Sequence, residues 1–373
     1  MDETKNKSKG ISIAIILLVI VIGFGFVIGL TQVTHNLNNK EKSEISYFTF
    51  DEQGNVLGYS GTKTDIVIPE TYSFAKTSEK VEMASSSIYG LIERAKTLNI
   101  KNYTIKDETG NYTDDYGNTY YQEKYVLTYE KREVVEGDDY IVSGISNHIF
   151  QNNSNIKSIT MPDTITHIDS GAFMGCSNLK TVKLSANLER LENSVFFNCI
   201  NLKEITLPET LTYIGPQCFQ YCNTLTEVTI PSGINYITDM SFANCNNLRK
   251  VTFNGPITQI ASEGFANCRS LTEINLPSSL ERIENRAFYN CKSLNNVILP
   301  SSIRYIGNQA FYNCTGMTDI TINAINIPDI EYNCFSNAYI QNIYVLDELY
   351  DNYLGYVNWA NYTGRIRRIS EKI

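Results

Sequence analysis

Hydrophobic positions recur along this chain with a period of 23 residues. The repeat is clearest at Ser278–Pro300, SSLERIENRAFYNCKSLNNVILP, which is followed directly by SSIRYIGNQAFYNCTGMTDITIN. One phenylalanine and one cysteine keep fixed places in each unit. They are Phe150, Phe173, Phe196, Phe219, Phe242, Phe265, Phe288 and Phe311, and Cys176, Cys199, Cys222, Cys245, Cys268, Cys291 and Cys314. Such a sustained period predicts a solenoid in which each unit covers the apolar face of its neighbour.

Each unit contains two extended segments and a corner. Leu294–Leu299 has the L-x-x-V-x-L spacing of a leucine-rich repeat strand, and Leu280–Ile283 predicts a shorter extended piece. Glu284–Ser293 predicts a tight helical or turn corner, in which Asn290 is a turn residue. The inward positions of this unit are Leu280, Ile283, Ala287, Phe288, Cys291, Leu294, Val297 and Leu299. One unit buries too little apolar surface to fold alone, so stability must belong to the array.

The repeated pattern I-P-x-x-(I/L)-x-x-I-x-x-x-x-F-x-x-C-x-x-L-x-x-(I/V)-x-(I/L)-P resembles the Treponema pallidum-type leucine-rich repeat of BspA-like bacterial surface proteins. The resemblance covers residues 138–346. It implies a mainly β, right-handed leucine-rich repeat solenoid of about nine 23-residue coils with short helical corners. It also implies a cell-surface role in adhesion or in binding another macromolecule. The family supplies no catalytic residue, and its architecture says little about the ligand.

The N-terminal region predicts a membrane anchor. Residues 1–10 are polar, and Ile11–Leu30 is uncharged and apolar apart from Ser12, which is enough for a helix of about 30 Å. Because no small-x-small cleavage site follows, we expect an uncleaved signal anchor over residues 11–31. Lysines flank this segment on both sides, so charge alone does not set its orientation. The family resemblance implies a cytoplasmic tail over residues 1–10 and repeats on the extracellular side.

Between the anchor and the repeats, we expect a linker over residues 32–43 and cap strands over residues 44–72. The strands are predicted near Ser46–Phe50 and Ile66–Pro69, with a turn at Gln53–Asn55. The continuation typical of the family appears only from Asp139. Residues 73–137 are therefore interpreted as an insertion.

The insertion predicts an αββ element. A helix is expected from about Ser86 to Leu98, because its apolar residues fall on one face behind a run of serines that can cap it. Tyr103–Lys106 and Lys124–Tyr129 alternate as strands do. The acidic stretch Asp107–Asn118 between them does not have the glycine and ligand spacing of an EF-hand, which favours a solvated hairpin loop.

After the repeats, Ala324–Leu346 predicts a degenerate ninth coil in which Phe335 falls one place late. Degenerate units cap the ends of solenoids. Residues 347–373 then predict a C-terminal cap, with a helix-like segment over Asp347–Trp359 and a last strand near Arg365–Ile369. The single tryptophan, Trp359, is interpreted as core of that cap.

Composition narrows the function. The chain has a net charge of −9, and its sequence lacks the basic stripe that nucleic-acid binding requires. None of the three histidines belongs to a nucleophile motif, and no paired-cysteine metal motif is present. We therefore expect no enzyme, no cofactor and no metal. The nine cysteines are interpreted as small buried apolar residues, since thiols stacked in parallel on neighbouring coils are poorly placed to bridge.

The outward positions supply the candidate binding residues. On the shorter extended segment one outward column reads His167, Arg190, Tyr213, Tyr236, Gln259, Arg282 and Tyr305. Tyrosine and arginine are enriched in binding hot spots, so Arg190, Tyr213, Tyr236, Arg282 and Tyr305 are the predicted partner-binding residues. The alternative is that the stacked tyrosines only support one another along a solenoid edge.

Two functions remain open. In the first, the repeats of a membrane-anchored surface protein bind a protein or another cell-surface macromolecule. In the second, the repeats are a rigid spacer in an envelope complex and the 73–137 insertion carries the interaction.

Overall fold

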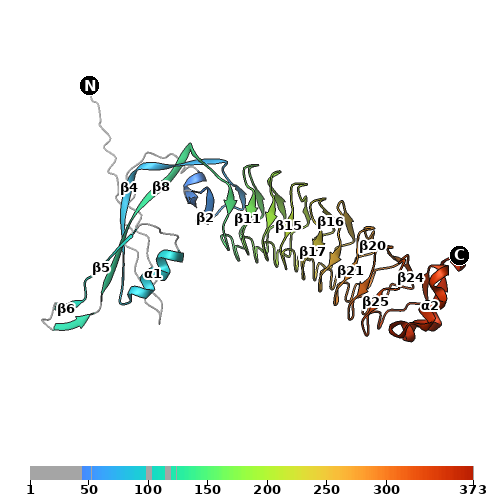
Figure 1. Cartoon of the computed structure of the whole chain (residues 1–373). Coiled ribbons are helices and arrows are strands. Elements are labelled where there is room, and N and C mark those ends of the chain that lie inside the picture. Colours follow the sequence, from blue (N-terminus) through green and yellow to red (C-terminus); the bar gives the residue numbers. More distant parts are fainter. Residues whose placement is uncertain (1–43, 52, 98–102, 114–118, 123, 373) are drawn as a thin grey trace, which may run out of the picture. The chain divides into compact units, whose positions relative to one another are not determined.

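The computed structural model describes residues 44–372 except residues 52, 98–102, 114–118 and 123 (Figure 1). The chain divides into two compact units. The described part of the first is Lys76–Arg132, and the second combines Ser43–Ala75 with Glu133–Ile373. The predicted tail, anchor and linker over residues 1–43 lie outside the described residues. Among the residues that are described, no helix is long and apolar enough to cross a membrane.

The second unit is a leucine-rich repeat solenoid, as predicted, and Figure 1 shows its coils stacked in chain order. Each coil contributes one short strand and one main strand. The short strands are β9 (Gly144–Ile145), β11 (His167–Ile168), β13 (Arg190–Leu191), β15 (Tyr213–Ile214), β17 (Tyr236–Ile237), β19 (Gln259–Ile260), β21 (Arg282–Ile283), β23 (Tyr305–Ile306) and β25 (Asp329–Ile330). The main strands are β10 (Ser158–Thr160), β12 (Thr181–Lys183), β14 (Glu204–Ile205), β16 (Glu227–Ile230), β18 (Lys250–Phe253), β20 (Glu273–Ile274), β22 (Val297–Leu299), β24 (Asp319–Ile322) and β26 (Asn342–Val345).

Neighbouring coils pair in parallel and in register with the sequence period. His167 pairs with Arg190 on the short strands, and Thr181 pairs with Glu204 on the main strands. The period therefore sets the register of the paired solenoid strands apart from the pair β23–β25, because a residue and its equivalent in the next unit become neighbours across the ladder.

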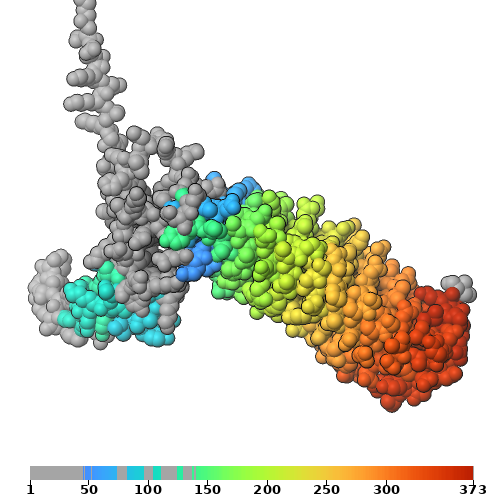
Figure 2. Space-filling view, turned by 45° about the horizontal axis from the view of Figure 1, so that its top comes forward, coloured from blue at the N-terminus to red at the C-terminus, as the bar shows by residue number. Residues whose placement is uncertain are grey.

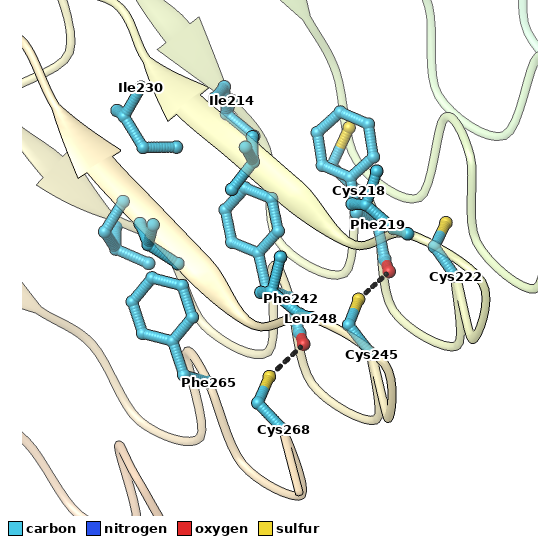
Figure 3. Close-up of a cluster of buried hydrophobic side chains, with 14 of the residues drawn as sticks. Ile214, Cys218, Phe219, Cys222, Ile230, Phe242, Cys245, Leu248, Phe265 and Cys268 are labelled. Atoms are coloured by element: carbon cyan, nitrogen blue, oxygen red, sulfur yellow. Dashed lines mark hydrogen bonds between the residues drawn. The ribbon is translucent and has the colours of Figure 1, made fainter. Parts of the chain in front are cut away.

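The repeated phenylalanines form one continuous stack through the core. Each ring lies 5.0 to 5.6 Å from the next, with interplanar angles of 5° to 18°. Figure 3 shows Phe219, Phe242 and Phe265 with the aliphatic side chains around them. Phe335 joins the stack on Phe311 at 5.6 Å despite its late position. This coil has one extra residue, which lies before the last short strand, because Asp329 of that strand pairs with Tyr305, 24 positions earlier.

The repeated cysteines form a second column beside the phenylalanines. Each thiol donates a hydrogen bond of 3.0 to 3.3 Å to the carbonyl oxygen of the phenylalanine in the preceding coil. Figure 3 shows this for Cys245 and Cys268. All nine cysteines are buried free thiols. Cys218 and Cys334 lie directly before the stacked phenylalanines, where Ala172, Ala287 and Ala310 occur in other coils.

The thiols should therefore be unreactive in the folded protein. Burial raises the pKa of Cys245 to about 12, which leaves very little of the nucleophilic thiolate at pH 8. We expect a maleimide to label the native full chain slowly and to label nine thiols after denaturation. Fast labelling of the native protein, or a disulfide mapped between two members of the column, would contradict the stacked arrangement.

The corners of the coils are hydrogen-bonded turns, so the turn alternative for Glu284–Ser293 is confirmed and the short helical corners were wrong. Two residues in each corner, two places before and two places after the phenylalanine, have left-handed backbone conformations. In one coil these are Arg286 (φ 56°) and Asn290 (φ 60°). An α-helix cannot continue through residues with positive φ.

The left-handed residues turn alternate N–H groups toward the next coil. In the coil of Phe288, the N–H groups of Arg286, Phe288 and Asn290 donate to carbonyls of the following coil at 2.9, 2.8 and 2.7 Å. The same three bonds recur in the coils of Phe196, Phe219 and Phe242. The corner thus forms a third backbone ladder. Its left-handed backbone explains why asparagine is common at the second position, since asparagine tolerates this conformation better than most residues.

The N-terminal cap joins the solenoid across the insertion. It contains a 3₁₀ turn, η1 (Glu44–Tyr47), and the strands β1 (Phe48–Phe50), β2 (Asn55–Tyr59) and β3 (Asp65–Val67). Strand β2, which the pattern did not predict, pairs in parallel with β9, and β3 pairs with β10. Between β1 and β2, Gly54 has φ +87°, and a Cβ there would clash with the Ile141 carbonyl oxygen.

The insertion contains more strand than predicted. Its elements are β4 (Thr71–Ser85), α1 (Ile88–Thr97), β5 (Tyr103–Asp107), β6 (Gly110–Thr113), β7 (Thr119–Gln122) and β8 (Tyr125–Ile141). Helix α1 lies where a helix was predicted and is capped by Ser87, whose Oγ accepts from the Gly90 N–H at 3.2 Å. The unit has its own small core, formed by Met83, Leu91, Ala95 and Leu127. Strand β4 was missed, because residues 76–80 in its middle are all polar and interrupt the alternation.

The C-terminal cap closes the last coil. It consists of η2 (Asp347–Leu349), α2 (Tyr350–Gly355), η3 (Val357–Arg365), β27 (Ile366–Arg368) and η4 (Ile369–Glu371), and β27 pairs with β26. Trp359 is fully buried, and its Nε1–H donates to the Pro328 carbonyl at 2.9 Å. Its ring lies 6.3 Å from that of Phe335. The interpretation of Trp359 as core is therefore confirmed.

Candidate functional site

The short strands align the predicted binding residues in one column, here called the tyrosine column. Its members are His167, Arg190, Tyr213, Tyr236, Gln259, Arg282 and Tyr305, each the first residue of a short strand. Backbone pairing places Arg190 beside Tyr213 and Arg282 beside Tyr305. The following residue of every strand is buried, so the column lies on the outer side of each strand.

Both arginines of the tyrosine column are engaged within the molecule. Arg190 forms an ion pair with Glu192 at 2.8 Å, and its guanidinium lies 4.3 Å from the centre of the Tyr213 ring. Arg282 repeats this arrangement with Glu284 at 2.7 Å and Tyr305 at 4.2 Å. These arginines hold the tyrosine rings in place, and their charges are largely balanced.

Tyr305 is further held by a carboxylate. Its hydroxyl donates to Glu331 Oε1 at 3.2 Å. Burial, and then the charge of Glu331, raises the pKa of Tyr305. The glutamates at 192, 284 and 331 were not part of the predicted site. A signal for them existed, because each follows its short strand at an equivalent place in the repeat.

The middle of the tyrosine column forms a shallow hollow. Tyr213 and Tyr236 supply its aromatic surface, and the buried side chains of Thr238 and Ala261 leave room beside them. The hollow is lined by Tyr213, Pro216, Tyr236, Thr238, Asp239, Gln259 and Ala261. The Tyr236 side chain is 46% exposed, although that of Tyr213 is half-buried. The structure thus separates the five predicted residues into one exposed aromatic group and four that support each other in pairs.

Metal-ligating groups do not gather in the described part of the chain, where no three His, Cys, Asp or Glu side chains could hold one ion. His167 lies at the start of the tyrosine column with its Nδ1 3.2 Å from Thr166 Oγ1. What the geometry of this surface offers is an aromatic and polar contact area on a rigid scaffold.

Two solved structures illustrate what this chain is similar to. One is a leucine-rich repeat protein of T. pallidum, with 15% identity over 75% of this chain and 91% of that one, and a TM-score of 0.41. The other is a leucine-rich cell surface protein of Faecalibacterium prausnitzii, with 20% identity over 91% of this chain and 97% of that one, and a TM-score of 0.40. A comparison with curated proteins found no match.

The comparison with protein families gives the assignment. Residues 143–272 and 258–352 match the BspA type leucine rich repeat region, in six copies. These two ranges cover the solenoid from the residue directly before β9 to helix α2 of the C-terminal cap. The chain therefore belongs to the family of proteins with BspA type leucine-rich repeats.

Proposed function

We propose that this chain is a cell-surface protein that binds a protein partner through the tyrosine column and performs no catalysis itself. Membership in the family of BspA type leucine-rich repeats is consistent with a role in protein–protein interaction. The proposal places the repeats outside the cell and residues 11–31 in the membrane as a signal anchor. The apolar length of Ile11–Leu30 supports the anchor.

The observation that carries the proposal is the exposure of Tyr236 in the hollow. Outward aromatic side chains are costly to leave in water, and tyrosine offers a large contact area with little conformational entropy to lose. Arg190 and Arg282 fix the rings on both sides of it. A preorganised surface of this kind lowers the entropic cost of binding.

Replacing Tyr236 by serine should therefore abolish partner capture. The test is photo-cross-linking on intact cells that display the full chain, with captured proteins quantified by mass spectrometry. Tyr339→Ser is the matched control, because Tyr339 is 68% exposed and lies outside the tyrosine column. The two variants should have melting temperatures within a few degrees of the parent protein, since exposed side chains contribute little to stability.

Three outcomes decide the matter. Loss of one reproducible partner with Tyr236→Ser and its retention with Tyr339→Ser would support the proposal. Equal capture by both variants would contradict the role of the column. In the same cells, added protease should remove the repeats, and their complete protection would contradict the extracellular placement.

The second candidate function puts the interaction in the insertion. It is favoured by the separate core of the unit Lys76–Arg132 and by the exposure of Tyr89, at 70%, on α1. A chain in which residues 76–132 are replaced by a short glycine linker distinguishes the two functions. If that chain loses the partner and Tyr236→Ser keeps it, the repeats act as the rigid spacer of an envelope complex.

A further inference from the structure

Three lysines form a row on the main-strand side of the first coils. Lys157, Lys180 and Lys203 each directly precede a main strand, and all three side chains are exposed. Their backbones are joined, because the Lys180 N–H donates to the Lys157 carbonyl at 2.8 Å and the Lys203 N–H donates to the Lys180 carbonyl at 3.3 Å. We call these residues, with the exposed Lys183 of β12, the lysine row.

The lysine row concentrates positive charge in a chain whose net charge is −9. None of its four lysines forms an ion pair with a described carboxylate. Strand pairing places two carboxylates among the four lysines, Asp65 beside Ser158 and Glu204 beside Thr181, which leaves an excess of two positive charges. Asp65 is already bonded by the Ser158 and Thr64 hydroxyls, and Ser158, with Lys157 as a smaller contributor, lowers its pKa.

Like charges on adjacent coils cost stability. Parallel neighbours lie about 4.8 Å apart, and charges of one sign placed side by side across strands repel one another. The equivalent positions in the next coils are Thr226, Arg249 and Thr272, so the repeat itself does not require lysine there. An anionic ligand would turn this repulsion into attraction.

We infer that the lysine row binds a sulfated polysaccharide laid along the solenoid axis. Charge complementarity selects a linear polyanion that can run along adjacent coils, which lie about 4.8 Å apart. A sulfated polysaccharide carries sulfates on more than one side of its chain, so several of them can meet the long, flexible lysine side chains.

The chemistry of lysine agrees with this ligand. A lysine ammonium is a compact charge on a flexible stem, so it can follow sulfates whose positions vary along a polymer chain. Exposed hydroxyls of Thr181 and Thr206 lie on the same face and can bond sugar hydroxyls. This inference uses the other sheet of the solenoid and does not depend on the tyrosine column.

Heparin binding by the full chain tests the inference. The parent protein should bind heparin with an affinity that falls as sodium chloride is raised, since binding releases counterions. The triple variant Lys157→Gln, Lys180→Gln, Lys203→Gln should lose on the order of tenfold in affinity, which corresponds to about 1.4 kcal/mol. It should melt no lower than the parent protein, because the substitutions remove repulsion.

The matched control is Arg269→Gln, Lys292→Gln, Arg304→Gln. These three residues are exposed and form no ion pair with described residues, and their substitutions remove the same charge as the triple lysine variant. The control should keep heparin affinity within about twofold, as expected when only distant screened charges change. Equal losses of heparin affinity in both triple variants would mean that only the net charge matters, and would overturn the inference. So would tighter binding of polyglutamate, polyphosphate or single-stranded DNA than of heparin, or undiminished binding of desulfated heparin.

Discussion

Replacing Phe242 by alanine is expected to lower the free energy of unfolding by about 3 to 5 kcal/mol. The ring is fully buried and touches the next ring on both sides, with centroids 5.2 Å from Phe219 and 5.5 Å from Phe265. Its loss opens a cavity that cannot collapse, because the backbone ladders hold both neighbouring coils in place. Urea unfolding of the full chain followed by circular dichroism measures the effect.

Two comparisons sharpen this prediction. Tyr339→Ala removes an aromatic ring that is 68% exposed, so it should change the free energy of unfolding by less than about 0.5 kcal/mol. Phe242→Leu keeps most of the volume and should cost clearly less than alanine. If Phe242→Ala were as stable as Tyr339→Ala, the stack would not be the core that holds the coils together.

Replacing Asn290 by valine should cost about 2 to 4 kcal/mol, the second largest effect we expect. Two causes add. Asn290 has φ 60°, a conformation that a β-branched residue avoids. Its buried side chain also donates to Asn267 Oδ1 at 2.7 Å and accepts from Asn313 Nδ2 at 2.8 Å. Valine would leave both neighbours without a partner.

A glycine at the same place separates the two causes. Asn290→Gly permits the left-handed conformation and loses only the amide bonds, so it should cost about 1 kcal/mol. The free energies of unfolding of both variants come from the same urea titration. Equal losses for glycine and valine would mean that the positive φ of Asn290 contributes nothing to the cost of the valine substitution.

The stack of phenylalanines, the column of cysteines and the backbone ladder of the corners together hold the coils to one another. The phenylalanines are among the largest fully buried side chains. Each thiol adds a weak bond to a carbonyl that already accepts from the turn, as Phe242 does from the Cys245 N–H. The corners orient backbone groups along the solenoid axis. Because these features are internal, the outer columns are free to vary, and binding residues can change without loss of the fold.

The tyrosine column shows where prediction from residues alone stops. The period put Arg190 and Tyr213 side by side, and the structure confirms that pairing. The sequence did not show that Arg190 bonds Glu192 in its own coil, which makes the arginine a support for the ring. Side-chain rotamers decide such contacts, and several partners lie within reach of one long side chain.

The sequence by itself determined the coil, its length and the inward columns. Each unit packs against a near copy of itself, so the pattern of one unit sets the contacts of all, and Phe173 or Cys199 could be placed without further information. The buried role of Trp359 was predicted for a related reason, since the end of an array must be covered.

Only the tertiary structure decided the remaining features. The left-handed corners depend on bonds to the next coil, which let Met240 and Tyr221 adopt a conformation that their side chains disfavour. The pairing of β2 with β9 joins Asn55 to Gly144 across the whole insertion, and no local pattern encodes a contact of that range. Phe335 entered the stack because burial of its ring outweighed the 23-residue period, and one extra residue was absorbed before β25.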